Sequence, residues 1–434
     1  MKGIARFMLR VKGPEEKADV IWNTAGSLIY ALANMILAFL VIRMAGEEAG
    51  GIFAMGFSTF GQQMFTLSYY GLRPFQITDG GPDQGGLSFG EYLFHRKITA
   101  GIAVAAAGLF AAWHFWGGSY SMEKAAAVFM LAGYKIVDGY ADVYESEFQR
   151  QGKLYLTGKS TAFRTILSAG VFLFTLGVAG KLLAACAAAL FAQILGLCLF
   201  DFSVMECLSQ ADRRRRKGKV MEIFTQGGLL FLSVFLDFYI FSAARYAVDL
   251  NMDDGAAGYF NLIFMPTSVI YLVANFVIRP FLTRLTVCWN SGDNKGFKQI
   301  IWKISGLIAF LTVLAVGGTL CLGRPVLRIM ELALGPSHEG SLTAYVPAFV
   351  IIVLGGGIYA FGNLLYYSLV IMRRQKRIFA VYVVVALAAF WIAPALVRQQ
   401  GLNGAAGSYC LFMVMQAAGF GAWVLWEFKG RSKR

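Results

Sequence analysis

Long runs of apolar residues alternate with short polar stretches along the whole chain, and this alternation predicts its architecture. A run of about 18 or more apolar residues is long enough to cross a bilayer core as a helix. Twelve apolar runs are found, at residues 20–42, 49–72, 98–116, 124–144, 165–179, 182–200, 223–244, 255–278, 304–323, 344–372, 378–397 and 402–426. The sequence therefore predicts an all-α membrane protein with about twelve transmembrane helices.

The basic residues between these runs predict the orientation of the chain. If the amino terminus is cytoplasmic, 31 of the 39 Lys and Arg residues lie in segments on the cytoplasmic side and 7 on the other, with Lys135 inside a span. Short cytoplasmic loops carry the excess of Lys and Arg in membrane proteins. We therefore expect a multi-pass protein of the cytoplasmic membrane with both termini in the cytoplasm.

Composition supports a membrane protein, and the membrane topology explains the positive net charge. The chain is 57% hydrophobic and 15% charged, with a net charge of +14, whereas soluble domains have about 45–50% apolar and about 25% charged residues. The basic excess follows the membrane topology, and anionic headgroups attract the same loops. We expect no nucleic-acid partner, and we interpret the basic run 213–217 as a solvated cytoplasmic linker.

The second and eighth spans resemble each other, which predicts an internal repeat. Each begins with an acidic pair followed by small residues and an aromatic residue, and each ends in an Arg-Pro-Phe sequence. Gly51 precedes Arg73 by 22 residues, and Gly258 precedes Arg279 by 21 residues. Six spans separate the two copies, so they share an orientation, which is typical of a parallel repeat. We therefore predict two six-helix lobes, at 1–207 and 220–434, joined by a basic linker at 208–219.

Two similar lobes around an axis along the membrane normal are typical of transporters that open a central site to alternate sides. Ionisable side chains inside spans are the candidates for such a site, because they are costly in hydrocarbon and usually face a cavity or a partner. On the fourth span, Lys135, Asp138, Asp142 and Glu145 share one helix face. Lys135 is a candidate cation for an anionic substrate group, and Asp138 a candidate for tuning it or carrying a coupling proton. The structural alternative is a Lys135–Asp138 ion pair that only neutralises itself.

Further candidates lie on the seventh span and at the two repeat motifs. Asp237 is in the middle of the seventh span, where it is a candidate for ion or proton coupling, and Arg245 follows eight residues later on the same face. Arg73 and Arg279 are related by the repeat, and their planar guanidinium groups suit a phosphate at the cytoplasmic mouth. The structural alternatives are a helix–helix pair for Asp237 and interfacial positions for the two arginines.

Catalytic motifs are scarce in the sequence. The histidines are His95, His114 and His338, none of them at a metal-ligand spacing from another, and no Walker or Gly-x-Ser-x-Gly motif occurs. We therefore expect no enzyme activity, no metal and no cofactor.

Particular segments resemble a known superfamily. They are Tyr144–Lys153 after the fourth span, with Arg164 opening the fifth, Arg73–Asp79 after the second, and the stretch from Pro280 to the ninth span. With the six-plus-six spans and the basic linker, these segments make the chain similar to O-antigen-type flippases for polysaccharide or oligosaccharide lipids. Those flippases belong to the multidrug/oligosaccharidyl-lipid/polysaccharide (MOP) exporter superfamily.

The resemblance implies a function and its partners. An undecaprenyl-diphosphate-linked oligosaccharide would cross the cytoplasmic membrane by alternating access for surface polysaccharide biosynthesis. A coupling ion, H⁺ or Na⁺, and polysaccharide-assembly proteins would be its other partners, besides the lipid bilayer. Two alternatives stay open: a cation-coupled drug or toxin exporter of the same superfamily, and a membrane glycan polymerase or ligase.

Overall fold

The computed structural model describes residues 2–11, 13–81, 86–208, 212–216 and 218–431. In this described part, the chain is 89% helical and contains no strand, which confirms the all-α prediction. The chain forms two compact units, Met1–Phe231 and Leu232–Arg434. The boundary lies inside a helix, α11, rather than in the basic segment 208–219, and the role of that segment as the divider between lobes stays a prediction.

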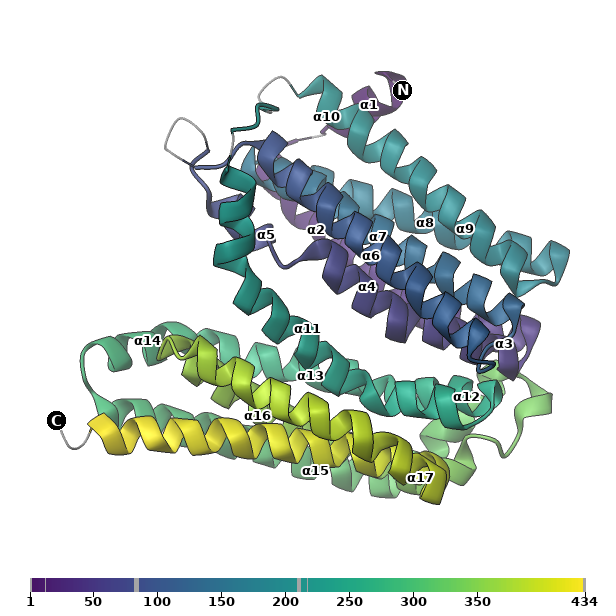
Figure 1. Ribbon diagram of the computed structural model, residues 1–434, viewed down its shortest axis with the longest axis vertical. Helices are drawn as coiled ribbons and strands as arrows, with labels where there is room; N and C mark the ends of the chain where they lie inside the picture. Colours follow the sequence, from purple (N-terminus) through teal and green to yellow (C-terminus); the bar gives the residue numbers. More distant parts are fainter. Residues whose placement is uncertain (1, 12, 82–85, 209–211, 217, 432–434) are drawn as a thin grey trace. The chain divides into compact units, whose positions relative to one another are not determined.

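The first unit contains the helices of the first six predicted spans (Figure 1). They are α1 (Lys2–Leu9), α2 (Glu15–Ala45), α3 (Glu47–Phe53), the π-helix η1 (Ala54–Thr59), α4 (Phe60–Tyr69), α5 (Arg73–Thr78), α6 (Phe89–Trp116), α7 (Met122–Arg150), α8 (Leu154–Ala179), α9 (Leu182–Gly196), the π-helix η3 (Leu197–Phe202) and α10 (Ser203–Cys207). The helix α11 (Lys219–Asn251) begins in this unit and continues into the second.

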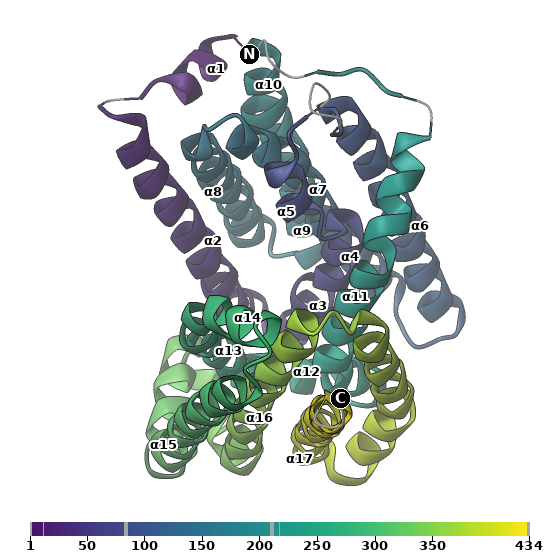
Figure 2. The same ribbon diagram turned by 90° about the vertical axis from the view of Figure 1, so that its left-hand side faces the viewer.

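The second unit continues from α11 through the remaining spans, and α13, α15 and α17 are grouped around α16 (Figure 2). Its elements are α12 (Asp254–Phe264), α13 (Pro266–Ile278), the 3-10 turn η4 (Arg279–Phe281), α14 (Leu282–Asn290), α15 (Asn294–Leu334), the 3-10 turns η5 (Pro336–His338) and η6 (Thr343–Tyr345), α16 (Val346–Ile371) and α17 (Gln375–Arg431). Residues 326–334, beyond the predicted ninth span, extend α15.

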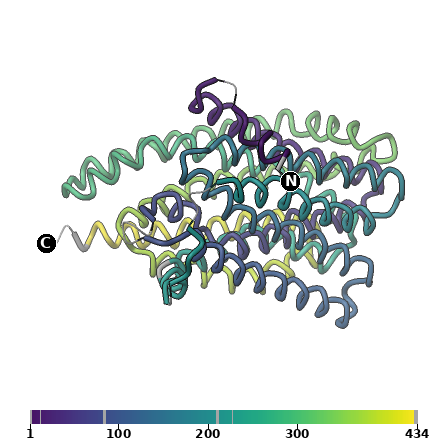
Figure 3. Tube along the Cα trace, turned by 90° about the horizontal axis from the view of Figure 1, so that it is seen from above, coloured from purple at the N-terminus to yellow at the C-terminus, as the bar shows by residue number. Residues whose placement is uncertain are grey.

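The described helices account for every predicted span. Nine segments of the described chain are long and apolar enough to cross a membrane. The last of these, in α17, holds two spans, because Gly401 has φ 58 and ψ −135 and interrupts the helix there. The second span is divided among α3, η1 and α4, and the fourth, α7, carries many charged residues. With these additions the count reaches twelve, and Figure 3 follows the trace from above.

The two spans that share the sequence repeat are both interrupted in the membrane region. In the second span, the π-helix η1 separates α3 from α4. In the eighth, Pro266 lies at the start of α13 and has no N–H to continue the bonds of α12, which ends at Phe264. The repeat therefore extends from sequence to backbone: each copy is a broken helix that ends at an Arg-Pro-Phe sequence.

The fourth span of each unit, which is α7 in the first and α16 in the second, is its central helix. In the first unit, α7 packs against α4, α6, α8 and α9, and in the second unit α16 packs against α13, α15 and α17. Three consecutive glycines allow the close approach in the second case. A Cβ at Gly355 would lie 2.7 Å from Tyr409, one at Gly356 2.9 Å from Ile270, and one at Gly357 2.2 Å from Thr312. These glycines therefore allow close helix packing around α16.

Candidate functional site

The polar face of α7 lies in the interior of the first unit. Lys135 is 2% exposed, Asp138 8%, Asp142 5% and Glu145 6%. Their spacing of three, four and three residues places them on one side of the helix, as predicted. Because neighbouring helices cover this side, each charge needs a partner within the protein.

Arg164 on α8 is the centre of the resulting network. Its Nη2 atom lies 2.9 Å from Asp138 Oδ1 and 2.9 Å from Glu145 Oε1. Its Nη1 atom lies 2.9 Å from Oδ2 of Asp201, which comes from the π-helix η3. Ser160 donates a 2.6 Å hydrogen bond to the other oxygen of Asp201. One guanidinium thus joins α7, α8 and the end of the sixth span.

Two further arginines hold Asp142. The Nη1 atom of Arg73 is 2.9 Å from Asp142 Oδ1, and the Nη2 atom of Arg96 is 3.1 Å from Oδ2. Arg73 also lies 3.5 Å from Glu145. Arg96 is 1% exposed and donates a second bond, of 3.0 Å, to the carbonyl of Ser68. These contacts connect α5 and α6 to the carboxyl-terminal half of α7.

Lys135 is linked to Asp138 through a hydroxyl and not by a direct ion pair. Its Nζ atom donates to the hydroxyl of Tyr30 at 3.1 Å, and that hydroxyl donates to Asp138 Oδ2 at 2.9 Å. The ammonium also lies 3.8 Å from the ring centre of Phe57. No described carboxylate lies at ion-pair distance from Lys135. The simple Lys135–Asp138 pair considered from the sequence is therefore replaced by a relay through Tyr30.

The formal charges of this network cancel. In the described part of the first unit, it joins four carboxylates and four cations: Asp138, Asp142, Glu145 and Asp201 with Lys135, Arg73, Arg96 and Arg164. Each carboxylate accepts from at least one guanidinium. Lys135 forms the fewest hydrogen bonds in the network. An ammonium has three donor hydrogens, and this one has a single oxygen acceptor, Tyr30, besides the two aromatic rings that it contacts.

Asp237 in the second unit has a different environment. It is half-buried on α11, and it accepts from the hydroxyl of Tyr359 at 3.0 Å and from the amide of Gln416 at 2.9 Å. Within the described chain, no base lies at ion-pair distance from it. Arg245, two turns further on, donates to Ser242 at 3.0 Å and lies over the ring of Phe264. Asp237 and Arg245 are thus held by different partners.

The two arginines of the repeat also differ. Arg73 is 26% exposed and belongs to the network on α7, whereas Arg279 lies in the turn η4 and is exposed. The idea that both grip one phosphate stays a prediction.

Sequence reasoning missed three members of the network. Arg96 and Arg164 were counted among the cytoplasmic bases of the positive-inside rule, yet they are 1% and 2% exposed. Asp201 follows the sixth apolar run and was not singled out. A useful signal was available: each of the three lies within one or two helical turns of a predicted span boundary, where a long side chain reaches inward as easily as outward.

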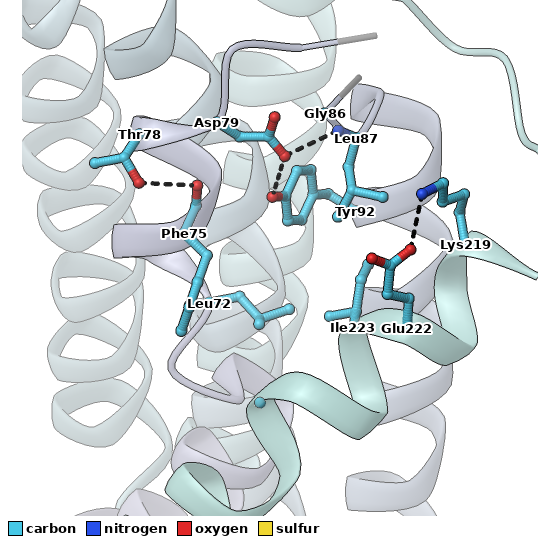
Figure 4. A pocket seen from close by; sticks show the side chains of 11 residues that line it. Leu72, Phe75, Thr78, Asp79, Gly86, Leu87, Tyr92, Lys219, Glu222 and Ile223 are labelled. Carbon is cyan, nitrogen blue, oxygen red and sulfur yellow. Dashed lines mark hydrogen bonds and ion pairs between the residues drawn. The ribbon is translucent and has the colours of Figure 1, made fainter. Parts of the chain in front are cut away.

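A pocket of about 310 Å³ lies at the end of the first unit where α11 begins (Figure 4). Apolar walls come from Leu72, Phe75, Leu87 and Ile223. Its carboxylate, Asp79, is already bound: Tyr92 donates to it at 2.8 Å and the amide of Leu87 at 2.9 Å. Lys219 and Glu222 pair with each other at 2.8 Å. Its polar groups are thus internally satisfied, and the pocket is less suited to a charged ligand than the α7 network.

Comparison with solved structures identifies the fold. A multidrug resistance MATE family transporter of the MOP superfamily, inward-facing, is 10% identical over 96% of this chain and 99% of that chain, with a TM-score of 0.69. The lipid II flippase MurJ, inward closed, is 13% identical over 94% of this chain and 87% of that chain, with a TM-score of 0.66. The fold is that of the MOP transporters. No protein-family model and no curated protein matches the chain.

A third structure with the MOP fold is a transporter from Pyrococcus furiosus. It is 13% identical over 97% of this chain and 96% of that chain, with a TM-score of 0.55. For that protein, a reverse polarity of the binding pocket is taken to suggest a different function. At these identities the similarity shows the twelve-helix, two-lobe architecture, and the substrate must be argued from the side chains.

Proposed function

We propose that this chain is a transporter that flips undecaprenyl-diphosphate-linked oligosaccharide across the cytoplasmic membrane by alternating access, for surface polysaccharide biosynthesis. The MOP fold supports a transporter, because drug exporters and a lipid flippase share it. The choice of an anionic lipid-linked substrate rests on the charge arrangement on α7. Its carboxylates are occupied by arginines, while Lys135 keeps unused donor capacity.

The occupied carboxylates argue against a cationic cargo in the first unit. A cationic drug that bound Asp138 or Glu145 would have to displace Arg164, which contacts both at 2.9 Å. Breaking such a buried pair typically costs about 3–5 kcal/mol. A diphosphate instead needs cations with free donors, and an ammonium binds phosphate as a point charge. Lys135, with its single oxygen acceptor, meets that need best within the network.

Asp237 supports a coupling role, with H⁺ or Na⁺ as the ion. Its carboxylate is surrounded by neutral donors from Tyr359 and Gln416. Because no base compensates it in the described chain, taking up a proton or a small cation would neutralise the charge. The same feature favours the second candidate function, a cation-coupled drug or toxin exporter, in which Asp237 would serve the coupling ion or the cationic cargo.

The decisive measurement is transbilayer movement of a fluorescent undecaprenyl-diphosphate oligosaccharide in proteoliposomes. The wild type is compared with Lys135→Ala and Lys135→Arg, and with Lys97→Ala as a matched control, because Lys97 is an exposed lysine of the same unit. We expect movement by the wild type and the control. Movement by Lys135→Ala should fall about tenfold or more, equivalent to at least about 1.4 kcal/mol, with partial recovery in Lys135→Arg.

The other outcomes are equally informative. Equal movement by the wild type and Lys135→Ala would retain the flippase and return Lys135 to a structural role. If no lipid-linked glycan moves but a soluble cationic dye is exported, the drug exporter replaces the flippase.

A further inference from the structure

The basic segment before α11 is docked on the start of α6. The amide of Gly90 donates to the carbonyl of Asp212 at 3.0 Å, and the hydroxyl of Ser88 donates to the carbonyl of Arg214. Both contacts use the segment's backbone, and the side chains of residues 213–216 are exposed. The backbone of 212–216 is thus packed on α6, while the role of this segment as a solvated cytoplasmic linker stays a prediction.

Glu91 clamps the end of this segment. Its carboxylate accepts from Arg216 Nε at 3.0 Å, from Arg216 Nη2 at 2.9 Å and from the Arg216 backbone amide at 2.9 Å. The same carboxylate forms the capping box of α6 with Ser88. Hydrogen bonding to Glu91 raises the pKa of the Arg216 guanidinium, so Arg216 keeps its positive charge in this contact. A fully buried acid therefore fixes both the helix start and the segment.

Gly90 makes the docking possible. A Cβ at this position would lie 2.3 Å from the carbonyl oxygen of Arg213 and 2.8 Å from that of Arg214. Both are backbone atoms, so they do not rotate away as a side chain would. Any other residue at position 90 must push the segment off α6.

The docked segment presents three cations beside an exposed aromatic ring of the candidate span α6. Arg213, Arg214 and Arg215 are exposed, and in the described chain no carboxylate lies at ion-pair distance from them. The guanidinium of Arg215 lies 4.7 Å from the ring centre of Phe94, which is 38% exposed on the candidate span α6. Lys97, one turn further along α6, is also exposed. Basic side chains at the end of a span commonly extend to the level of the lipid headgroups.

We propose that Arg213, Arg214 and Arg215, held on α6 by Gly90 and Glu91, form a binding site for the headgroup of an anionic phospholipid. The guanidinium fork matches phosphate oxygens, and basic residues at the surface of an anionic leaflet each contribute about 1 kcal/mol. Phe94 favours a lipid over a soluble polyanion, because it holds Arg215 beside an exposed apolar side chain of the candidate span α6. The site is separate from the buried network on α7 and does not depend on the transported substrate.

Native mass spectrometry of the full-length protein in detergent, titrated with phosphatidylglycerol and with phosphatidylcholine, tests the proposal. We expect the wild type to retain phosphatidylglycerol preferentially. The triple variant Arg213→Gln, Arg214→Gln, Arg215→Gln should bind it about tenfold or more weakly. A control variant, Arg284→Gln, Lys295→Gln, Lys303→Gln, removes the same charge from exposed positions of the second unit and should bind like the wild type.

A second pair of variants separates a built site from net charge. Gly90→Ala and Glu91→Gln preserve all three arginines, but they displace the segment or loosen its clamp. We expect each to weaken phosphatidylglycerol binding several-fold, with unchanged binding of phosphatidylcholine. Wild-type affinity in both would show that charge alone attracts the lipid and would overturn the site. Equal affinity of the triple variant and the wild type, or displacement of the lipid by RNA, would also overturn it.

Discussion

The central helices of the two units, α7 and α16, occupy equivalent places in the chain order but have opposite chemistry. The helix α7 carries Lys135 and the buried carboxylates Asp138, Asp142 and Glu145, which are joined to arginines from neighbouring elements. The helix α16 contains no charged residue and packs through three glycines. In the second unit, the carboxylate of Asp237 accepts hydrogen bonds from neutral donors.

This difference indicates a division of roles. Charges buried in a low-dielectric interior are tolerated when they are paired, so the first unit is held in one arrangement by its own ion pairs. Asp237 can change its charge without breaking an ion pair, because it has none in the described chain. The first unit therefore offers a fixed charge pattern, and the second offers a titratable group. Four predictions test this contrast, from the largest expected effect to the smallest.

Arg164→Met should be the most damaging change. It leaves Asp138, Glu145 and Asp201 buried without their shared guanidinium, and breaking a buried ion pair from one side costs about 3–5 kcal/mol. We expect a loss of that size in the free energy of unfolding in detergent. Arg324→Met, at an exposed position of the second unit, should change it by less than about 0.5 kcal/mol. Equal effects would refute the special role of the α7 network.

Asp138→Asn and Asp237→Asn provide the direct comparison of the two acids. Asp138 would lose a charged bond to Arg164, and hydrogen bonds to charged groups contribute about 1.5–3 kcal/mol. Asp237→Asn keeps a polar group and loses no ion pair, so its unfolding free energy should change by less than about 1 kcal/mol. Transport by Asp237→Asn should lose its dependence on pH or Na⁺. A larger destabilisation by Asp237→Asn than by Asp138→Asn would reverse the proposed division.

Tyr30→Phe and Tyr359→Phe remove one hydroxyl from each unit. Tyr30 is the oxygen acceptor of Lys135, so its loss leaves a buried ammonium unsatisfied, at a cost of about 1–3 kcal/mol. Asp237 keeps the bond from Gln416 when Tyr359 is changed, and the cost should be about 0.5–1.5 kcal/mol. Denaturant unfolding of both variants measures the difference. If the two costs are equal, Lys135 has acceptors other than Tyr30.

His95→Phe should stabilise the first unit slightly. His95 is fully buried between Tyr70 and Phe224, and no described residue is a hydrogen-bond partner for either ring nitrogen. Replacing an unsatisfied buried polar ring with an apolar one should raise the free energy of unfolding by about 1 kcal/mol. A rise in the thermal midpoint checks this, with Phe224→Leu as a destabilising control. A fall would show that the imidazole has a partner that the packing hides.

Much of the fold was predictable because it depends on local composition. Each of the twelve predicted spans coincides with helix, and a short turn at Gly180, whose φ is 63, separates the fifth from the sixth. The predicted helix ends were less accurate. The helix α15 continues to Leu334, past the predicted end of the ninth span, and α8 begins at Leu154, well before the predicted start of the fifth span. Polar residues extend these helices beyond the hydrocarbon, and hydrophobicity does not report such extensions.

The candidate site was predictable only on one helix. The spacing of Lys135, Asp138, Asp142 and Glu145 identified a polar face, because periodicity along a helix is a local property. Its partners Arg96 and Arg164 could not be identified from the sequence, because both also satisfied the positive-inside pattern. The counting rule treats every basic residue near a span end alike, whether it faces headgroups or an acid on another helix.

The sequence by itself determined the all-helical membrane fold, the order of the spans and the acidic face of α7, since each depends on residues close together in the chain. Tertiary structure alone decided which charges meet. The partners Tyr30 and Asp138 are 108 residues apart, and Tyr359 and Asp237 are 122 apart. Such pairs form only when packing brings distant helices together. Burial then decides whether a charge is neutralised, as on α7, or left among neutral donors, as at Asp237.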